Sequence, residues 1–397
     1  MRITIVCDTY PPIQHVSGLR AGTFAKQLAA NGARVSVLSA LEDGEPHIED
    51  EGGIRVARLL RDPWHALHRS GLSRQLTTAR HILDRGPYPE WVERGISLIK
   101  EGHLEAPDVV WGIGSDSPHE LAKRSGALWG RPWIPDFKDD WGSGKHGTGR
   151  VLAAARTRQR LKTATHITSA SSVGAVELAR RFGVDASVIY SGVDLAHWRN
   201  ATPADLGPHF NIVFTGHVAE GRIMLPEIAM GGLTQAVREA GLDAVRLHYF
   251  GHDGGLLRAH LGSCPEIFVD HGFQDHEAIA SVQSGADLLL HLPYVDRAQV
   301  CVKFLEYVAT QRPVLCVPGE PDGLGRIFTT RDGVFTASSP EEVSRLVTRL
   351  INAKATASLP SFQRALDAYT WEAQTKSLIT VLERVVQSTG ENDGRSA

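Results

Sequence analysis

The sequence is poor in cysteine and has no long apolar run. Its four cysteines, Cys7, Cys264, Cys301 and Cys316, lie far apart and form no C-x-x-C pair. This spacing argues against a disulfide framework and against a structural zinc site. No apolar stretch approaches the ~20 residues that span a bilayer. The opening apolar run Ile3–Val6 is too short for a signal peptide and predicts a buried first strand. We therefore expect a cytoplasmic protein.

The motifs of several common enzyme classes are also absent. The chain contains no Walker loop, no G-x-S-x-G elbow and no H-E-x-x-H pair. It has neither an Asp-x-Asp pair nor a Cys/His cluster, so no metal site and no cofactor is expected. The net charge of −3 disfavours a nucleic-acid-binding protein, because such proteins usually carry a basic excess.

Short apolar runs alternate with amphipathic stretches along the whole chain, which predicts parallel α/β sheets. In the first half the predicted strands are Ile3–Cys7, Val35–Leu38, Ile54–Leu59, Val109–Ile113, Trp133–Asp136, His166–Ser169 and Val188–Tyr190. In the second half they are Ile212–Thr215, Leu247–Phe250, Ile267–Val269, Leu288–Leu290 and Val314–Val317. The alternation restarts after residues 201–209, where Pro203, Gly207 and Pro208 indicate a linker.

A length of 397 residues suits two such domains. We predict a Rossmann-like N-terminal domain over residues 1–200 and a Rossmann-like C-terminal domain over residues 210–365. A last helix is expected over residues 370–387, followed by a disordered tail at 388–397. Ligands of such domains bind at the carboxyl ends of the parallel strands.

The start of one predicted helix carries a cation. Residues 302–309 read Val-Lys-Phe-Leu-Glu-Tyr-Val-Ala, and Lys303 and Glu306 project from the same face of the first turn. A cation opposes the helix dipole there, and a diphosphate bound by the ammonium and the free N–H groups would offset that cost. Glu306 could then accept hydrogen bonds from ribose hydroxyls. The alternative is an ordinary surface ion pair.

This segment resembles the P-S-K-x-x-E-Y-x-A motif of the retaining GT-B glycosyltransferases of family four. The branch with an acidic D-F-R-D-x-W motif is most similar, and that motif reads Asp136-Phe137-Lys138-Asp139-Asp140-Trp141 here. Other matching segments, in the family's order, are Tyr10-Pro11-Pro12, Gly18-Leu19-Arg20, Val188–Asp194, Phe214-Thr215-Gly216, Gly221-Arg222 and Tyr369–Glu372. The chain departs from the family at Cys301-Val302, which replaces Pro-Ser, and at Ala298, where many relatives carry a glutamate that touches the donor sugar. The resemblance therefore does not identify the donor sugar.

The resemblance implies two Rossmann-like domains facing each other across a cleft, with the helix at 370–387 packing back on the first. It implies transfer of a sugar from a nucleotide-sugar co-substrate to an acceptor hydroxyl, with retention of configuration and without a metal. The first domain would bind the acceptor and the second the donor. The implied donor-binding residues are Gly216, Arg222, Lys303 and Glu306, and the acceptor-side residues are Gly18 and Asp136. The candidate catalytic residues are Asp139, from the acidic motif, and His119, which follows the predicted strand Val109–Ile113. Alternatively, the acidic cluster caps a helix or forms salt bridges, and His119 is a surface histidine.

Several alternatives stay open. The donor could be a UDP-, GDP- or dTDP-sugar, and the acceptor a glycan, a lipid carrier or a small molecule. The basic stretch Arg156–Lys162 either contacts anionic lipid at the inner membrane face or forms a solvated helix face. Two other functions fit the same pattern: an epimerase of nucleotide sugars, which needs no acceptor, and a partner subunit that binds a nucleotide sugar without turnover.

Overall fold

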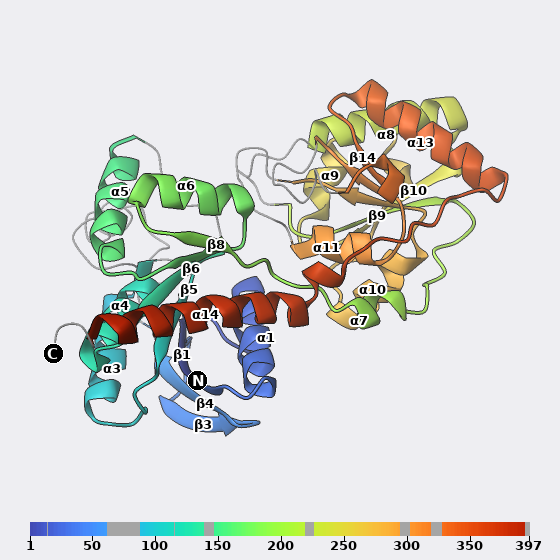
Figure 1. Cartoon of the computed structure of the whole chain (residues 1–397). Coiled ribbons are helices and arrows are strands. Elements are labelled where there is room, and N and C mark those ends of the chain that lie inside the picture. The colour runs from blue at the N-terminus through green and yellow to red at the C-terminus, as the bar shows by residue number, and fades with distance from the viewer. Residues whose placement is uncertain are drawn as a thin grey trace. The chain divides into compact units, whose positions relative to one another are not determined.

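The computed structural model describes residues 1–13, 15–61, 88–114, 116–138, 147–218, 226–293, 302–318 and 328–393. The chain forms two compact α/β units (Figure 1). The N-domain comprises Met1–Ser191 together with Trp371–Ala397, and the C-domain comprises Gly192–Thr370. The first boundary lies before the segment 201–209 that the sequence suggested as a linker. The short helix α7 (Leu195–Arg199) consequently belongs to the C-domain.

The chain passes between the two domains twice, and the flanking segments are paired. Val193 forms a parallel bridge with Thr370, and its N–H donates a hydrogen bond to the Tyr369 carbonyl at 2.9 Å. On the N-domain side, the Tyr190 N–H donates to the Gln374 side-chain oxygen at 2.7 Å. The outgoing and returning connections are therefore held beside each other.

The N-domain sheet, within the described residues, has eight strands in the order β3-β4-β2-β1-β5-β6-β7-β8. Its strands are β1 (Arg2–Cys7), β2 (Arg34–Leu41), β3 (His47–Glu51), β4 (Ile54–Leu60), β5 (Val109–Ile113), β6 (Trp133–Phe137), β7 (Ile167–Ser169) and β8 (Ala186–Val188). These strands pair in parallel, apart from β3, which is antiparallel to β4. Strand β3 has no apolar run and was not predicted. As an edge strand it needs only one neighbour, and its Glu49 and Glu51 pair with the buried Arg58 of β4.

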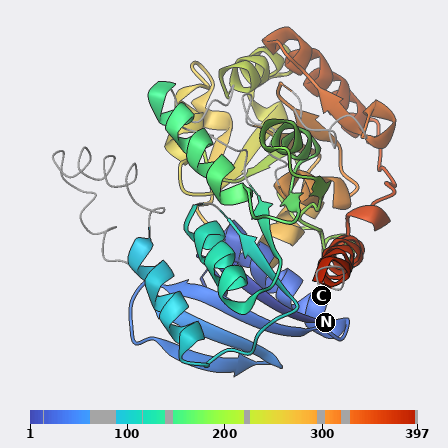
Figure 2. The same ribbon diagram turned by 60° about the vertical axis from the view of Figure 1, so that its left-hand side comes forward.

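Helices cover both faces of this sheet. They are α1 (Val16–Ala30), α3 (Pro89–Lys100), α4 (Asp116–Trp129), α5 (Gly147–Leu161), α6 (Ser172–Phe182) and α14 (Trp371–Asp393). Helices α1 and α14 share one hydrophobic core with the sheet, and the Phe24 and Trp371 rings meet edge-to-face at 5.3 Å. The core on the other face includes Trp91 of α3 and Leu121 of α4. Figure 2 shows α3 and α4 on one side of the sheet and α14 on the other.

The last helix is longer than predicted. It continues to Asp393, so the prediction of a disordered tail was wrong for residues 388–393, and residues 394–397 lie outside the described part. The buried residues Leu378, Leu382 and Val385 fix the helix to the N-domain core. At the start of the extension the hydroxyls of Ser388 and Thr389 donate to the Val385 carbonyl, at 3.0 and 2.9 Å. The polar composition that suggested disorder therefore belongs in part to this helix.

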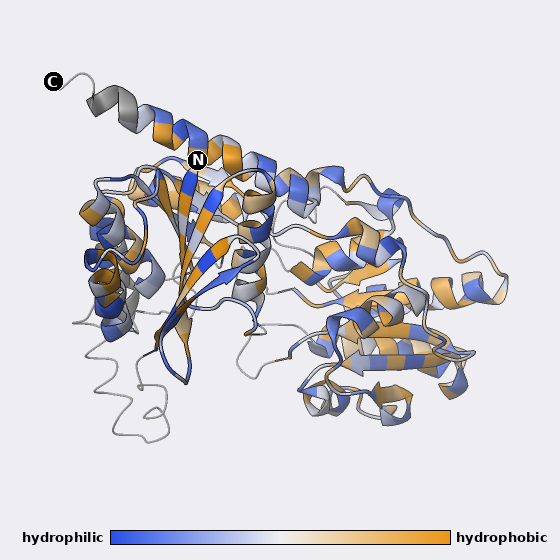
Figure 3. Cartoon of the chain, turned by 90° about the horizontal axis from the view of Figure 1, so that it is seen from below, coloured by the Kyte–Doolittle hydropathy of each residue, from blue (hydrophilic) through white to orange (hydrophobic). Residues whose placement is uncertain are grey.

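The C-domain sheet, in its described part, has six parallel strands in the order β11-β10-β9-β12-β13-β14. They are β9 (Phe210–Thr215), β10 (Val245–Phe250), β11 (Phe268–Asp270), β12 (Leu288–His291), β13 (Val314–Cys316) and β14 (Val334–Thr336). The helices packed on it are α8 (Pro226–Ala240), α9 (Gly254–Ala259), α10 (His276–Gly285), α11 (Val302–Ala309) and α13 (Pro340–Ala355). Figure 3 shows apolar residues concentrated along the central strands of each domain.

Helices α8 and α13 approach each other closely. A Cβ atom at Gly232 of α8 would lie only 2.4 Å from the Val343 Cβ of α13, so glycine permits this contact. No helix in the described ranges is both long enough and apolar enough to cross a membrane.

Candidate functional site

In the C-domain, α11 is fixed to the carboxyl end of β9. The buried Tyr307 of α11 accepts a hydrogen bond from the Thr215 N–H at 2.8 Å, and its oxygen lies 3.1 Å from the Thr215 hydroxyl. Gln283 of α10 donates to the same hydroxyl at 3.0 Å. The Thr215 N–H therefore bonds a side chain at the point where β9 ends, and this contact sets the position of α11.

Lys303 lies against the turn that follows β9. A Cβ atom at Gly216 would be 3.3 Å from Cε and 3.4 Å from Cδ of Lys303. Gly216 has φ +149°, a conformation that favours glycine. The turn is held by its own polar contacts, because the Gly216 N–H donates to the Phe250 carbonyl at 2.9 Å and the Tyr249 hydroxyl donates to the Gly216 carbonyl at 2.8 Å. Lys303 and Gly216, which were predicted as donor-binding residues from separate segments of the sequence, thus lie in contact.

Glu306, one turn after Lys303, has a partner that sequence reasoning missed. Its Oε1 lies 3.4 Å from Nε2 of His276, the first residue of α10. Glu306 is 7% exposed, whereas the His276 side chain is 58% exposed. The hydrogen bond with Glu306 raises the pKa of His276 above its ordinary value. The sequence offered one clue to this pair. Helices α10 and α11 each follow a strand of the same parallel sheet, so their first turns lie at the same edge of that sheet.

An exposed aromatic pair follows β10 and β11. The rings of His252 and Phe273 are stacked, with centroids 4.9 Å apart and 7° between the planes. Phe273 is 58% exposed, which is unusual for a large apolar side chain. These residues follow neighbouring parallel strands and belong to the same edge of the C-domain sheet as Gly216.

In the N-domain, Asp136 is part of a buried ion pair. Arg20 donates to both of its carboxylate oxygens, at 2.8 and 2.9 Å, and Thr168 donates to Oδ1 at 2.7 Å. Arg20 also donates to the Ile189 carbonyl at 2.8 Å and to the Ser191 hydroxyl at 3.2 Å. The Asp136 side chain has no exposed surface, so it does not meet an acceptor directly. It joins α1, β6, β7 and the segment that leaves the domain.

The other predicted acceptor-side residue, Gly18, lies where the loop after β1 touches α1. A Cβ atom at Gly18 would be 3.1 Å from the Ile13 carbonyl oxygen. A larger residue would push this loop away from the helix. Gly18 therefore sets the distance between the loop and α1, which is a structural requirement.

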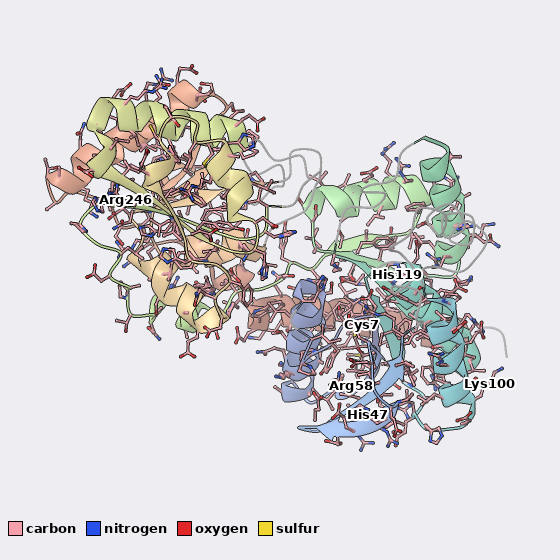
Figure 4. All side chains as sticks on the ribbon, turned by 180° about the vertical axis from the view of Figure 1, so that it is seen from behind. Cys7, His47, Arg58, Lys100, His119 and Arg246 are labelled. Atoms are coloured by element: carbon pink, nitrogen blue, oxygen red, sulfur yellow. The ribbon has the colours of Figure 1, made fainter. Side chains whose placement is uncertain are left out.

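His119 of α4 is buried in the N-domain, where Figure 4 labels it. Its Nε2 lies 3.1 Å from the Asp136 carbonyl, and its ring meets that of Phe137 at 4.7 Å. Burial is the main cause that lowers the pKa of His119 to about 4, and the positive charge of Arg160 is the second cause. The imidazole is therefore neutral near pH 7, and because a carbonyl can only accept, Nε2 carries the proton. The candidates Asp139 and Arg222 lie outside the described residues.

The N-domain also has an open groove of about 670 Å³. Its lining residues are Pro11, Pro12, Ile13, Leu41, Glu42, Asp43, His47, Glu49, Glu51 and Arg58. Pro11 follows β1 and Glu42 follows β2, which places that part of the groove at the carboxyl ends of these strands. The buried Arg58 bonds Glu49, Glu51 and the Pro11 carbonyl. Figure 4 labels Arg58 and His47 near β3 and β4.

Among the described residues there is no group of three or more His, Cys, Asp or Glu side chains that could hold a metal ion. The described cysteines Cys7, Cys264 and Cys316 are buried and unbridged.

Comparison with protein-family models and with curated proteins gives no match. Solved structures do match. Sucrose-phosphate synthase from Thermosynechococcus elongatus has a TM-score of 0.60 at 14% identity, over 100% of this chain and 98% of its own. The α,α-trehalose 6-phosphate synthase of Burkholderia multivorans has a TM-score of 0.67 at 11% identity, over 98% and 99%. Anabaena HepE in complex with UDP has a TM-score of 0.59 at 12% identity, over 100% of each chain. The chain therefore has the fold of the GT-B glycosyltransferases, built from two Rossmann-like domains.

Proposed function

We propose that this protein is a glycosyltransferase that moves a sugar from a nucleotide-sugar donor to an acceptor hydroxyl. The observation that carries the proposal is the contact of Lys303 with Gly216, with Glu306 one turn further along α11. A cation, a glycine turn and a carboxylate at the carboxyl edge of a parallel sheet suit the diphosphate and ribose of one nucleotide.

Lys303 and the first N–H groups of α11 are assigned to the diphosphate. Negative charge accumulates on the phosphates as the sugar–phosphate bond breaks. A fixed cation and fixed N–H donors stabilise that charge without having to reorganise. Arg222 is proposed as a second cation because its sequence position follows the same β9 turn.

Glu306 is assigned to the ribose hydroxyls. Its carboxylate is nearly buried, so it is strongly desolvated and gains most from donors supplied by a ligand. The exposed His252–Phe273 pair offers a flat apolar surface for the base. HepE was solved with UDP, and a trehalose-phosphate synthase of similar fold is described as UDP-forming. These support UDP-sugars as the first donors to test, before GDP- and dTDP-sugars.

The acceptor is assigned to the N-domain, where the groove beside Pro11 and Glu42 provides space at strand ends. Asp136 acts only as a positioning residue in this proposal, since its carboxylate is fully engaged. The neutral, buried His119 suits a hydrogen-bonding role better than proton transfer at neutral pH. Asp139 remains the candidate for contact with the acceptor hydroxyl. We propose retention of configuration and independence of a divalent metal, both from the family resemblance.

The test is incubation of the full chain with UDP-glucose, GDP-mannose and dTDP-glucose, with and without EDTA and with a panel of glycan, lipid-linked and small-molecule acceptors. Release of nucleoside diphosphate and the anomeric configuration of the product are measured. Lys303→Ala should lose turnover, whereas Lys376→Ala, which removes an exposed lysine of α14, should not. A new nucleotide sugar formed without diphosphate release would indicate an epimerase, and donor binding without turnover would indicate a binding subunit. Loss of activity in EDTA, restored by magnesium, would contradict the metal-free reaction.

A further inference from the structure

His276 is the exposed end of a cluster that surrounds Glu306 in the C-domain. Its Nε2 faces Glu306 Oε1 at 3.4 Å. Its ring is stacked on that of His197, with centroids 5.0 Å apart and 11° between the planes. The Trp198 ring meets it edge-on at 5.2 Å. Three contacts from two other helices, α7 and α11, therefore fix the orientation of a side chain that is otherwise more than half exposed.

We propose that His276 is a positioning residue of the donor site, whose imidazolium holds the Glu306 carboxylate in place for the hydroxyl groups of the nucleotide. This inference rests on the proposed function. With Oε1 directed at His276, the carboxylate has one fixed orientation. No other side chain in the described part of the chain bonds this carboxylate, which leaves acceptor positions for a ligand. Holding a ligand-binding group in its bound orientation improves affinity because less ordering is needed on binding.

The charges around His276 favour its protonated form. Glu306 raises its pKa by hydrogen bonding and by charge, and Asp194 at the start of α7 adds to this effect. Burial and the ammonium of Lys303 act in the opposite direction, and the net result is a raised pKa. Among the described residues, His197 is the other titratable group in contact with the ring. On α10 itself, the carboxylate of the preceding residue, Asp275, accepts the Ala278 N–H and caps the helix.

Donor affinity should therefore depend on pH. Below the raised pKa of His276 the imidazolium makes a charge-assisted hydrogen bond to Glu306 and adds a positive charge near the diphosphate site. As pH rises through that pKa, the neutral ring keeps only a weaker hydrogen bond. The positive charge lost near the diphosphate, taken as the difference between a charge-assisted and a neutral hydrogen bond, corresponds to a loss of affinity of about five-fold.

The experiment measures donor dissociation constants by calorimetry from pH 5.5 to 8.5, with the probe chosen from UDP-glucose, GDP-mannose and dTDP-glucose by tightest binding. These diphosphate diesters do not titrate in that range. Wild type should weaken about five-fold across it, and His276→Gln should give a flat profile, because an amide donates to Glu306 without a charge. His276→Ala should bind weakly at every pH. The exposed histidine after α9 provides a matched control, and His260→Gln should keep the wild-type profile.

A second measurement does not need a ligand. The imidazole of His276 is titrated by NMR in the wild type and in Glu306→Gln, and its pKa should fall when the carboxylate is lost. Equal titration in both proteins would show that the pair does not form and would overturn the inference. Coincident pH profiles for wild type and His276→Gln would also overturn it, while leaving the proposed function intact. If none of the three donors binds wild type at any pH, the proposed function fails and the positioning role fails with it.

Discussion

The hydroxyl of Tyr307 offers a test of how the donor edge of the C-domain is built. Tyr307 is fully buried and accepts the N–H of Thr215, which is 1% exposed. Tyr307→Phe removes the acceptor and leaves that N–H buried without this partner. An orphaned buried donor costs roughly 1–3 kcal/mol, so we expect the C-domain to lose about 2 kcal/mol of unfolding free energy.

The same substitution at Tyr10 is the control. Tyr10 is also fully buried, but its hydroxyl has no hydrogen-bond partner among the described residues. Tyr10→Phe should therefore change stability by less than about 0.5 kcal/mol or increase it. Urea unfolding of the full chain, followed by hydrogen-exchange mass spectrometry, reads peptides of the two domains separately. Equal stability of Tyr307→Phe and wild type in the C-domain peptides would refute the role given to this contact.

Four further outcomes are expected. Lys303→Ala should lower kcat for sugar transfer more than it raises the donor dissociation constant, because the cation acts mainly on charge that develops in the transition state; equal effects on both would contradict this. Arg20→Leu should destabilise the N-domain by about 3–5 kcal/mol, since it leaves Asp136 as a buried unpaired charge, and Arg20→Leu with Asp136→Asn should recover part of the loss in urea titrations. His119 has a pKa of about 4 in the folded protein, below the unfolded value near 6.5, so its neutral form stabilises the fold above pH 6.5. That contribution, on the order of 3 kcal/mol, is lost as pH falls from 6.5 to 4. In His119→Gln the free energy of unfolding should therefore fall less steeply over this pH range than in the wild type. Phe273→Ala should weaken UDP binding by roughly 1–3 kcal/mol if its exposed ring stacks on the base, and unchanged calorimetric affinity would exclude that contact.

Most of the strands could be predicted because they contain short apolar runs, and the central strands β1, β5, β9 and β12 are buried along almost their whole length. Strand β3 could not, because its sequence His-Ile-Glu-Asp-Glu has the composition of a solvated loop and becomes a strand only through pairing with β4. The contact of Lys303 with Gly216 was predictable because both positions are fixed by the carboxyl edge of one parallel sheet. The partner of Glu306 was not, because choosing one histidine among 18 requires the order of strands in that sheet.

Asp136 shows a different limit of sequence reasoning. In the sequence it belongs to a cluster of charged residues at the end of a strand, which suggested either acceptor binding or a salt-bridge or helix-capping group. In the structure its carboxylate is fully buried, because Arg20, 116 positions away, pairs with both of its oxygens and Thr168 donates a third hydrogen bond. Long-range pairing of opposite charges has no local pattern, so the sequence could not decide between an ion pair and acceptor binding for Asp136.

The paired crossings between the domains also affect how the chain can fold during synthesis. The N-domain is built from two separate stretches, because α14 supplies Trp371 and Leu382 to the core that α1 begins. All of Gly192–Thr370 is translated between these stretches. The C-domain can therefore be completed on the ribosome while the N-domain still exposes the apolar surface that α14 will cover. Synthesis of the N-domain thus begins before that of the C-domain and ends after it. In the interval, the uncovered apolar surface of α1 is the part that must be kept from aggregating.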